Sequence, residues 1–66
     1  MKTAILAAIE DITPLFEDVT TSDLQGITEA RAFNILKGHG HPTDSISILQ
    51  LSDEILDGIY SKTEGR

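Results

Sequence analysis

Residues 26–38 have the sequence Gly26-Ile27-Thr28-Glu29-Ala30-Arg31-Ala32-Phe33-Asn34-Ile35-Leu36-Lys37-Gly38, and this segment is the most informative about the fold. Its first residue is a glycine, which adopts the left-handed backbone of a tight turn without steric penalty. Thr28 is a residue type that caps helix N-termini, and Gly38 is the type that commonly follows a helix C-terminus. The segment therefore predicts a turn at Gly26 that leads into a short helix ending near Lys37.

The same segment differs in charge from the rest of the chain. The 66 residues include 11 Asp and Glu against 5 Lys and Arg, for a formal net charge of −6. Between residues 26 and 41, however, Arg31 and Lys37 outnumber the single acid Glu29. Acidity alone favours a solvated surface, and the alternatives are a basic partner or mimicry of nucleic acid.

The length of the chain predicts one small domain. A chain of this size buries only about 60% of its unfolded surface, so its core is thin. We expect a single helical domain over residues 1–62 and a frayed tail over residues 63–66. The sequence has no cysteine, which excludes a disulfide, a thiolate zinc site and a cysteine nucleophile, and which fits a reducing cytoplasm.

The N-terminal apolar run does not predict a membrane or export segment. It ends at Glu10 and Asp11, and no small-residue cleavage site follows. No segment approaches the ~20 apolar residues that span a bilayer. We therefore expect a soluble, cytoplasmic protein with no membrane partner.

Apolar residues in the first third of the chain follow helical spacing. They are Ile5, Ile9, Ile12, Phe16 and Val19. Pro14 interrupts this stripe, because it has no N–H to donate to the carbonyl of Glu10, so the helix kinks or ends there. Thr13 and Pro14 suit the N-cap and first position of a new helix. We expect two helices, at about residues 3–12 and 14–20.

The C-terminal half predicts two further short helices after a loop at residues 38–42. Thr43 or Asp44 would cap the first of them, and three apolar residues would point inward: Ile46, Leu49 and Ile48. Ser52 would begin the second, with Leu51 and Leu56 as a hydrophobic staple. The chain as a whole predicts an all-α fold of four or five short helices around one small core.

The segment around Gly26 resembles helix-turn-helix domains of the Cro/repressor (XRE) type, a family that includes small antitoxin-like and phage regulators. Gly26–Thr28 is similar to the turn of that family, and Ala32 and Ile35 stand where it buries apolar residues of the recognition helix. Residues 37–51 are similar to its closing glycine, polar loop and fourth helix. The resemblance spans residues 22–56, and it implies a helix-turn-helix-like fold that binds double-stranded DNA and regulates transcription.

The resemblance also implies which side chains face DNA. The residues at the family's base-facing positions are Thr28, Glu29, Ala30, Phe33 and Asn34. The residues at positions that would contact the phosphate backbone are Arg31, Lys37 and His39. Phe33 has three interpretations: contact with a thymine methyl group, burial in the core, or anchoring of a protein partner.

The last part of the chain predicts either a dimer contact or closure of the monomer core. Its apolar face consists of Ile55, Leu56, Ile59 and Tyr60. An exposed face of this kind would form a homodimer and place two recognition helices about 34 Å apart on a palindromic site. The alternative is that the same four side chains cover the core of a single chain.

A second hypothesis for the function is an acidic protein-interaction module, such as a phage-type inhibitor or antirepressor that binds a regulatory or basic protein. An enzyme is not expected, because no serine–histidine–acid spacing stands out, and we predict no catalytic residue, cofactor or small-molecule substrate. His39 and His41 with Asp44 lack a third histidine or a cysteine that would complete a zinc site, so no metal is predicted.

Overall fold

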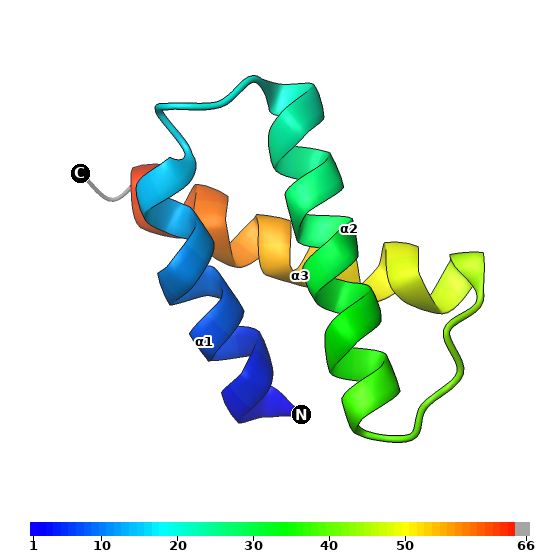
Figure 1. Ribbon diagram of the computed structural model, residues 1–66. Helices are drawn as coiled ribbons and strands as arrows, with labels where there is room; N and C mark the ends of the chain where they lie inside the picture. The colour runs from blue at the N-terminus through cyan, green and yellow to red at the C-terminus, as the bar shows by residue number, and fades with distance from the viewer. Residues whose placement is uncertain (65–66) are drawn as a thin grey trace.

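The structure is a computed structural model and describes residues 1–64. It consists of three α-helices and one 3-10 turn: α1 (Lys2–Ile12), η1 (Thr13–Leu15), α2 (Thr21–Gly38) and α3 (Ser45–Glu64). Helices α1 and α2 lie on the same side of α3, which crosses behind both of them (Figure 1). The all-α prediction is confirmed for the described residues, whereas the prediction of four or five helices is wrong, because there are three.

Helix α1 ends at Ile12, two residues before Pro14. The Thr13 hydroxyl donates a hydrogen bond to the Ile9 carbonyl, and Pro14 lies in the following 3-10 turn. The first predicted helix is therefore confirmed at its C-terminal end. The predicted helix over 14–20 is wrong, because the 3-10 turn ends at Leu15, residues 16–18 form only turns, and the backbone is extended at Thr20.

Helix α2 continues without a break through Gly26, so the predicted turn at this glycine is wrong. Gly26 has no positive φ, and the helix begins five residues earlier, where the Thr20 hydroxyl accepts a hydrogen bond from the Asp23 N–H at 3.1 Å. Leu24 is buried one turn before Thr28, on the same face of the helix. Burial of Leu24 offsets the cost of about 1 kcal/mol for a glycine inside a helix. The helix ends at Gly38, one residue after the predicted end at Lys37, and Gly38 is a helical residue without the positive φ expected of a glycine that follows a helix.

The polypeptide reverses direction after α2 at a different glycine from the one expected. Gly40 has a φ of 72°, the left-handed conformation in which glycine has no steric penalty. The His41 N–H donates to the Leu36 carbonyl at 2.9 Å, which satisfies one of the last carbonyls of the helix. The chain then reaches Asp44, one of the two predicted caps, whose carboxylate accepts from the Ser47 N–H and hydroxyl.

Helix α3 is a single helix where two were expected, so the predicted helix start at Ser52 is wrong. Ser52 is instead buried in the helix interior. The prediction that three apolar side chains near the start of α3 point toward the core is confirmed for Ile48, which packs against it. The same prediction is wrong for Ile46 and Leu49, which are exposed. In one continuous helix, the buried side chains Leu51 and Ile55 define the side of α3 that faces the core, and Ile46 points away from that side. Residues 63 and 64 of the predicted frayed tail belong to α3, while residues 65 and 66 lie outside the described part.

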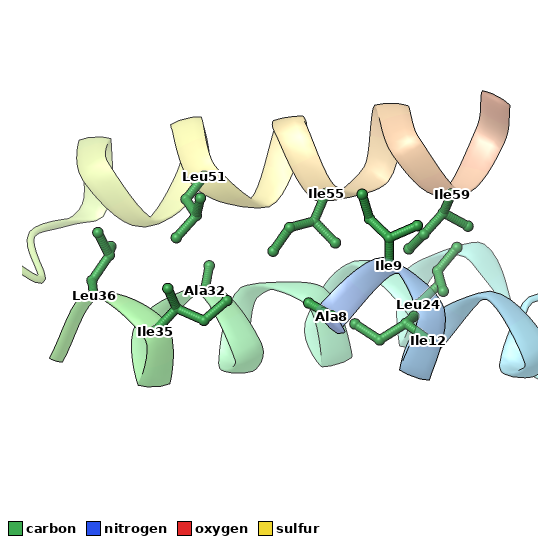
Figure 2. Close-up of a cluster of buried hydrophobic side chains, with 10 residues drawn as sticks. All are labelled: Ala8, Ile9, Ile12, Leu24, Ala32, Ile35, Leu36, Leu51, Ile55 and Ile59. Carbon is green, nitrogen blue, oxygen red and sulfur yellow. The ribbon is translucent and has the colours of Figure 1, made fainter. Parts of the chain in front are cut away.

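The core lies between α3 and the pair α1 and α2 (Figure 2). Its buried apolar side chains are Ala8, Ile9, Ile12, Leu24, Ala32, Ile35, Leu36, Leu51, Ile55 and Ile59. The helices α1 and α3 approach closely at Gly58, because a Cβ atom there would overlap the Cδ1 of Ile9. Within residues 1–64, no helix has both the length and the apolar character needed to cross a membrane.

Candidate functional site

The eight residues predicted to contact DNA do not form one surface. Thr28 is completely buried, and its hydroxyl donates to the Leu24 carbonyl at 2.7 Å, so its predicted roles as helix cap and base contact are wrong. Glu29 and Arg31 are half-buried at the flanks of α2. The exposed members are Ala30, Phe33, Asn34, Lys37 and His39. The outer face of α2 is therefore narrower and less polar than the resemblance implied.

Arg31 is already engaged by an acidic side chain of the same molecule. Its guanidinium lies 3.0 Å from the carboxylate of Asp11 and links α2 to α1. An exposed pair of this kind contributes at most about 1 kcal/mol to stability. Its electrostatic effect matters more here, because Asp11 offsets one of the two cations that were predicted to meet a phosphate backbone.

Phe33 stands on the outer face of α2, next to Lys37 on the following turn. The ring is 38% exposed, which excludes the interpretation that it fills the core. The Lys37 Nζ lies 5.9 Å from the ring centroid, a distance at which a cation and an aromatic face attract each other. The Lys37 side chain therefore lies along the surface of α2, with its ammonium group over the Phe33 ring.

The residues predicted to form a dimer contact divide between core and surface. Ile55 and Ile59 are completely buried within one chain, so their assignment to a dimer interface is wrong and the alternative of core closure applies to them. Leu56 is half-buried against the core. Tyr60 is 36% exposed and packs edge-on against Phe16, with the ring centroids 5.6 Å apart.

The sequence reasoning missed a row of side chains along one flank of α3, beside its core-facing side chains. We call this row the α3 seam, and it consists of Ile46, Leu49, Asp53, Leu56 and Tyr60. Ile46 is 67% exposed and Leu49 is 47% exposed, and the two lie next to each other on the same side of α3. The signal was present as the 3-4-3-4 spacing, but it was hidden because the prediction divided the helix at Ser52.

Carboxylates surround the α3 seam. Asp53 and Asp57 are exposed, and Glu54 and Glu64 lie on the same helix, whereas Lys62 is its only cation within the described residues. At the start of the helix, the hydrogen bond from the Ser47 hydroxyl lowers the pKa of Asp44 below its usual value of 3.8. The helix therefore presents apolar side chains within a strongly negative surface.

An open groove adjoins Asp53 on the flank of α3. Its apolar lining comes from the N-terminal residue, from α2, from the loop that precedes α3 and from α3 itself: Met1, Leu36, Pro42 and Leu51. Asp53 and Glu54 contribute carboxylates to the same groove. Asp53 thus borders both the groove and the aliphatic part of the α3 seam.

The histidines of the loop after α2 lie near each other, with ring centroids 6.4 Å apart. Among residues 1–64, no group of three His, Cys, Asp or Glu side chains is arranged to hold a metal ion. Comparisons with protein-family models, with curated proteins and with solved structures each found no match. The resemblance to helix-turn-helix regulators therefore gains no support from known proteins.

Proposed function

We propose that the protein is an acidic protein-interaction module that binds a basic, regulatory protein. The observation that carries the proposal is the α3 seam, where exposed Ile46 and Leu49 lie among the carboxylates of α3. Exposed aliphatic side chains favour contact with another apolar surface, and a surrounding field of one sign selects a partner of the opposite sign. The absence of cysteine is compatible with action in a reducing cytoplasm.

DNA binding is the second candidate, because Asn34 and Lys37 are exposed on the outer face of α2. The support for it is weaker than for a protein partner. The turn that would present α2 as a recognition helix is replaced by continuous helix, and Arg31 is paired with Asp11. The net charge of −6 also opposes approach to a polyanion.

Two titrations separate these candidates. The tagged protein is titrated with random-sequence and genomic duplex DNA at ~50 mM salt, a concentration at which non-specific phosphate contacts are detectable. In parallel, immobilised protein is exposed to a lysate of its own cells, and retained proteins are eluted with increasing salt and identified. We expect no DNA complex and retention of a protein with a basic surface.

The control for the capture is the immobilised variant Ile46→Ser/Leu49→Ser, which removes the exposed aliphatic groups and keeps every charge. The proposal is wrong if the protein binds duplex DNA at ~50 mM salt and Lys37→Gln weakens that binding. It is also wrong if no protein is retained at any salt concentration.

A further inference from the structure

Helix α3 carries two neighbouring apolar stripes, which meet at Leu56, half-buried against the core. One faces the core and contains the buried side chains Leu51, Ile55 and Ile59, as Figure 2 shows. The other is the α3 seam, whose members recur at steps of three and four residues between Ile46 and Tyr60. A helix that only covers a core needs one stripe, whereas a second stripe at this spacing is the pattern that packs against another helix.

The α3 seam has the length and exposure for helix–helix contact. Its five positions span four turns, or about 21 Å at the rise of an α-helix. Ile46 and Leu49 at one end are open to solvent, and Tyr60 at the other end exposes 36% of its surface. Leu56 is half-buried against the core and Tyr60 packs against Phe16, so the open part of the seam consists of Ile46, Leu49 and Asp53.

Asp53 determines the chemistry of the occupant. It is exposed and occupies the middle position of the seam, so a helix packed along the seam would enclose its carboxylate. An enclosed carboxylate without a partner is strongly unfavourable, whereas one that meets a lysine or arginine is compensated. A polar residue at a central seam position also fixes the register of the pair.

A second copy of this chain does not meet that requirement. Parallel in-register packing places Asp53 opposite Asp53, and so does antiparallel packing about a two-fold axis, because Asp53 is the midpoint of the seam. Asp57 adds a like charge beside each, and every chain carries a net charge of −6. The charges therefore favour a different, basic partner over a homodimer.

We propose that the α3 seam docks an amphipathic helix of a partner protein that places a lysine or arginine opposite Asp53 between two groups of apolar residues. This inference rests on the proposed function as an acidic interaction module and assigns the surface and the partner's chemistry. The aliphatic positions supply contact area, and Asp53 supplies register and discrimination between partners.

The test uses two synthetic 22-residue amphipathic helices that differ at one position. Each peptide has five positions at the same spacing as the α3 seam, and the first two and last two of these are leucine in both peptides. The middle position, which would lie opposite Asp53, is lysine in one peptide and glutamate in the other. Binding of each fluorescein-labelled peptide to the whole protein is followed by fluorescence anisotropy. We expect the lysine peptide to bind at least tenfold more tightly, and Asp53→Lys to reverse this preference.

Two matched variants separate the seam from general hydrophobicity. Ile46→Ser/Leu49→Ser changes two exposed side chains of α3 and is expected to weaken binding of the lysine peptide at least tenfold. Leu6→Ser/Leu15→Ser changes two exposed side chains outside α3 and is expected to leave the affinity within twofold. Thermal unfolding monitored by circular dichroism establishes that all variants are folded.

Several results would overturn the seam assignment: no preference between the peptides, no reversal by Asp53→Lys, or equal losses in the two double variants. A concentration-dependent dimer in sedimentation that Ile46→Ser/Leu49→Ser abolishes would assign the seam to a second copy instead. If the proposed function is right but the α3 seam is not the binding surface, a basic protein captured from lysate will bind the Ile46→Ser/Leu49→Ser variant as tightly as the unchanged protein. Failure of the proposed function leaves no captured protein at all.

Discussion

Replacing Gly26 by alanine tests the central structural finding, the continuity of α2. Gly26 lies inside the helix with no positive φ, and a Cβ atom placed on it meets no other atom within 4 Å. Alanine is favoured over glycine inside a helix by about 0.5–1 kcal/mol, mainly because glycine loses more backbone freedom on folding. We therefore expect Gly26→Ala to stabilise the protein by about this amount.

The corresponding change in melting temperature is large enough to measure. For 66 residues, the entropy of unfolding is about 0.14 kcal/mol per kelvin, from roughly 2.1 cal/mol per kelvin for each residue. A gain of about 0.5–1 kcal/mol then raises the melting temperature by roughly 4–7 °C. The assay is thermal unfolding followed by circular dichroism at 222 nm, with urea titration at 25 °C as an independent measure of the free energy of unfolding.

Two other glycines provide controls with the opposite sign. Gly40→Ala places a side chain at a φ of 72°, which costs roughly 1–2 kcal/mol for a residue other than glycine. Gly58→Ala forces a Cβ atom against Ile9, and such overpacking costs about 1–3 kcal/mol. A lower melting temperature for Gly26→Ala would refute the continuous helix and favour the turn that the resemblance implied.

Three further predictions concern the core, the ion pair and the cap of α3. Ile59→Ala should lower the free energy of unfolding by about 2–5 kcal/mol, because Ile59 is completely buried, and a urea titration with a loss below ~1 kcal/mol would contradict its place in the core. Asp11→Asn removes the partner of Arg31, and we expect a loss of at most about 1 kcal/mol that disappears in 1 M NaCl. A loss unaffected by salt would point to another role for Asp11. The lowered pKa of Asp44 means that its carboxylate stabilises the folded state above pH 3.8 and that this contribution is lost as the pH falls through the lower folded value. Asp44→Ala should therefore be less stable than the natural protein in urea at pH 7, and this difference should shrink towards pH 3; a constant difference would exclude the cap as its source.

The correct predictions from sequence depended on local chemistry. Pro14 cannot complete a helical hydrogen bond, and α1 ends two residues before it. The loop expected after α2 ends that helix, although the left-handed glycine in it is Gly40 and not Gly38, and Asp44 accepts hydrogen bonds at the start of α3. These residues act through their own backbone or the next turn, so their effects are visible in the linear sequence.

The wrong predictions arose where a residue type permits two conformations. Gly26 allows a turn but does not require one, and Ser52 is a good helix cap but is also tolerated inside a helix. The helix continues through Gly26 because Leu24 is buried just before it. It continues through Ser52 because Leu51 and Ile55 are buried on either side of it. The candidate site depended on that decision, because the α3 seam exists only if α3 is one helix.

The sequence by itself determined that the chain is helical and acidic, where α1 and α2 end, and which residue types are available for contact. Only the tertiary structure decided how long each helix is and which way its faces point, because these depend on the burial of side chains far apart in the chain. The same packing placed Thr28, Ile55 and Ile59 in the interior and left Ile46 and Leu49 outside. Local hydrogen bonding is encoded residue by residue, whereas the direction of each apolar stripe becomes defined only when three helices share one core.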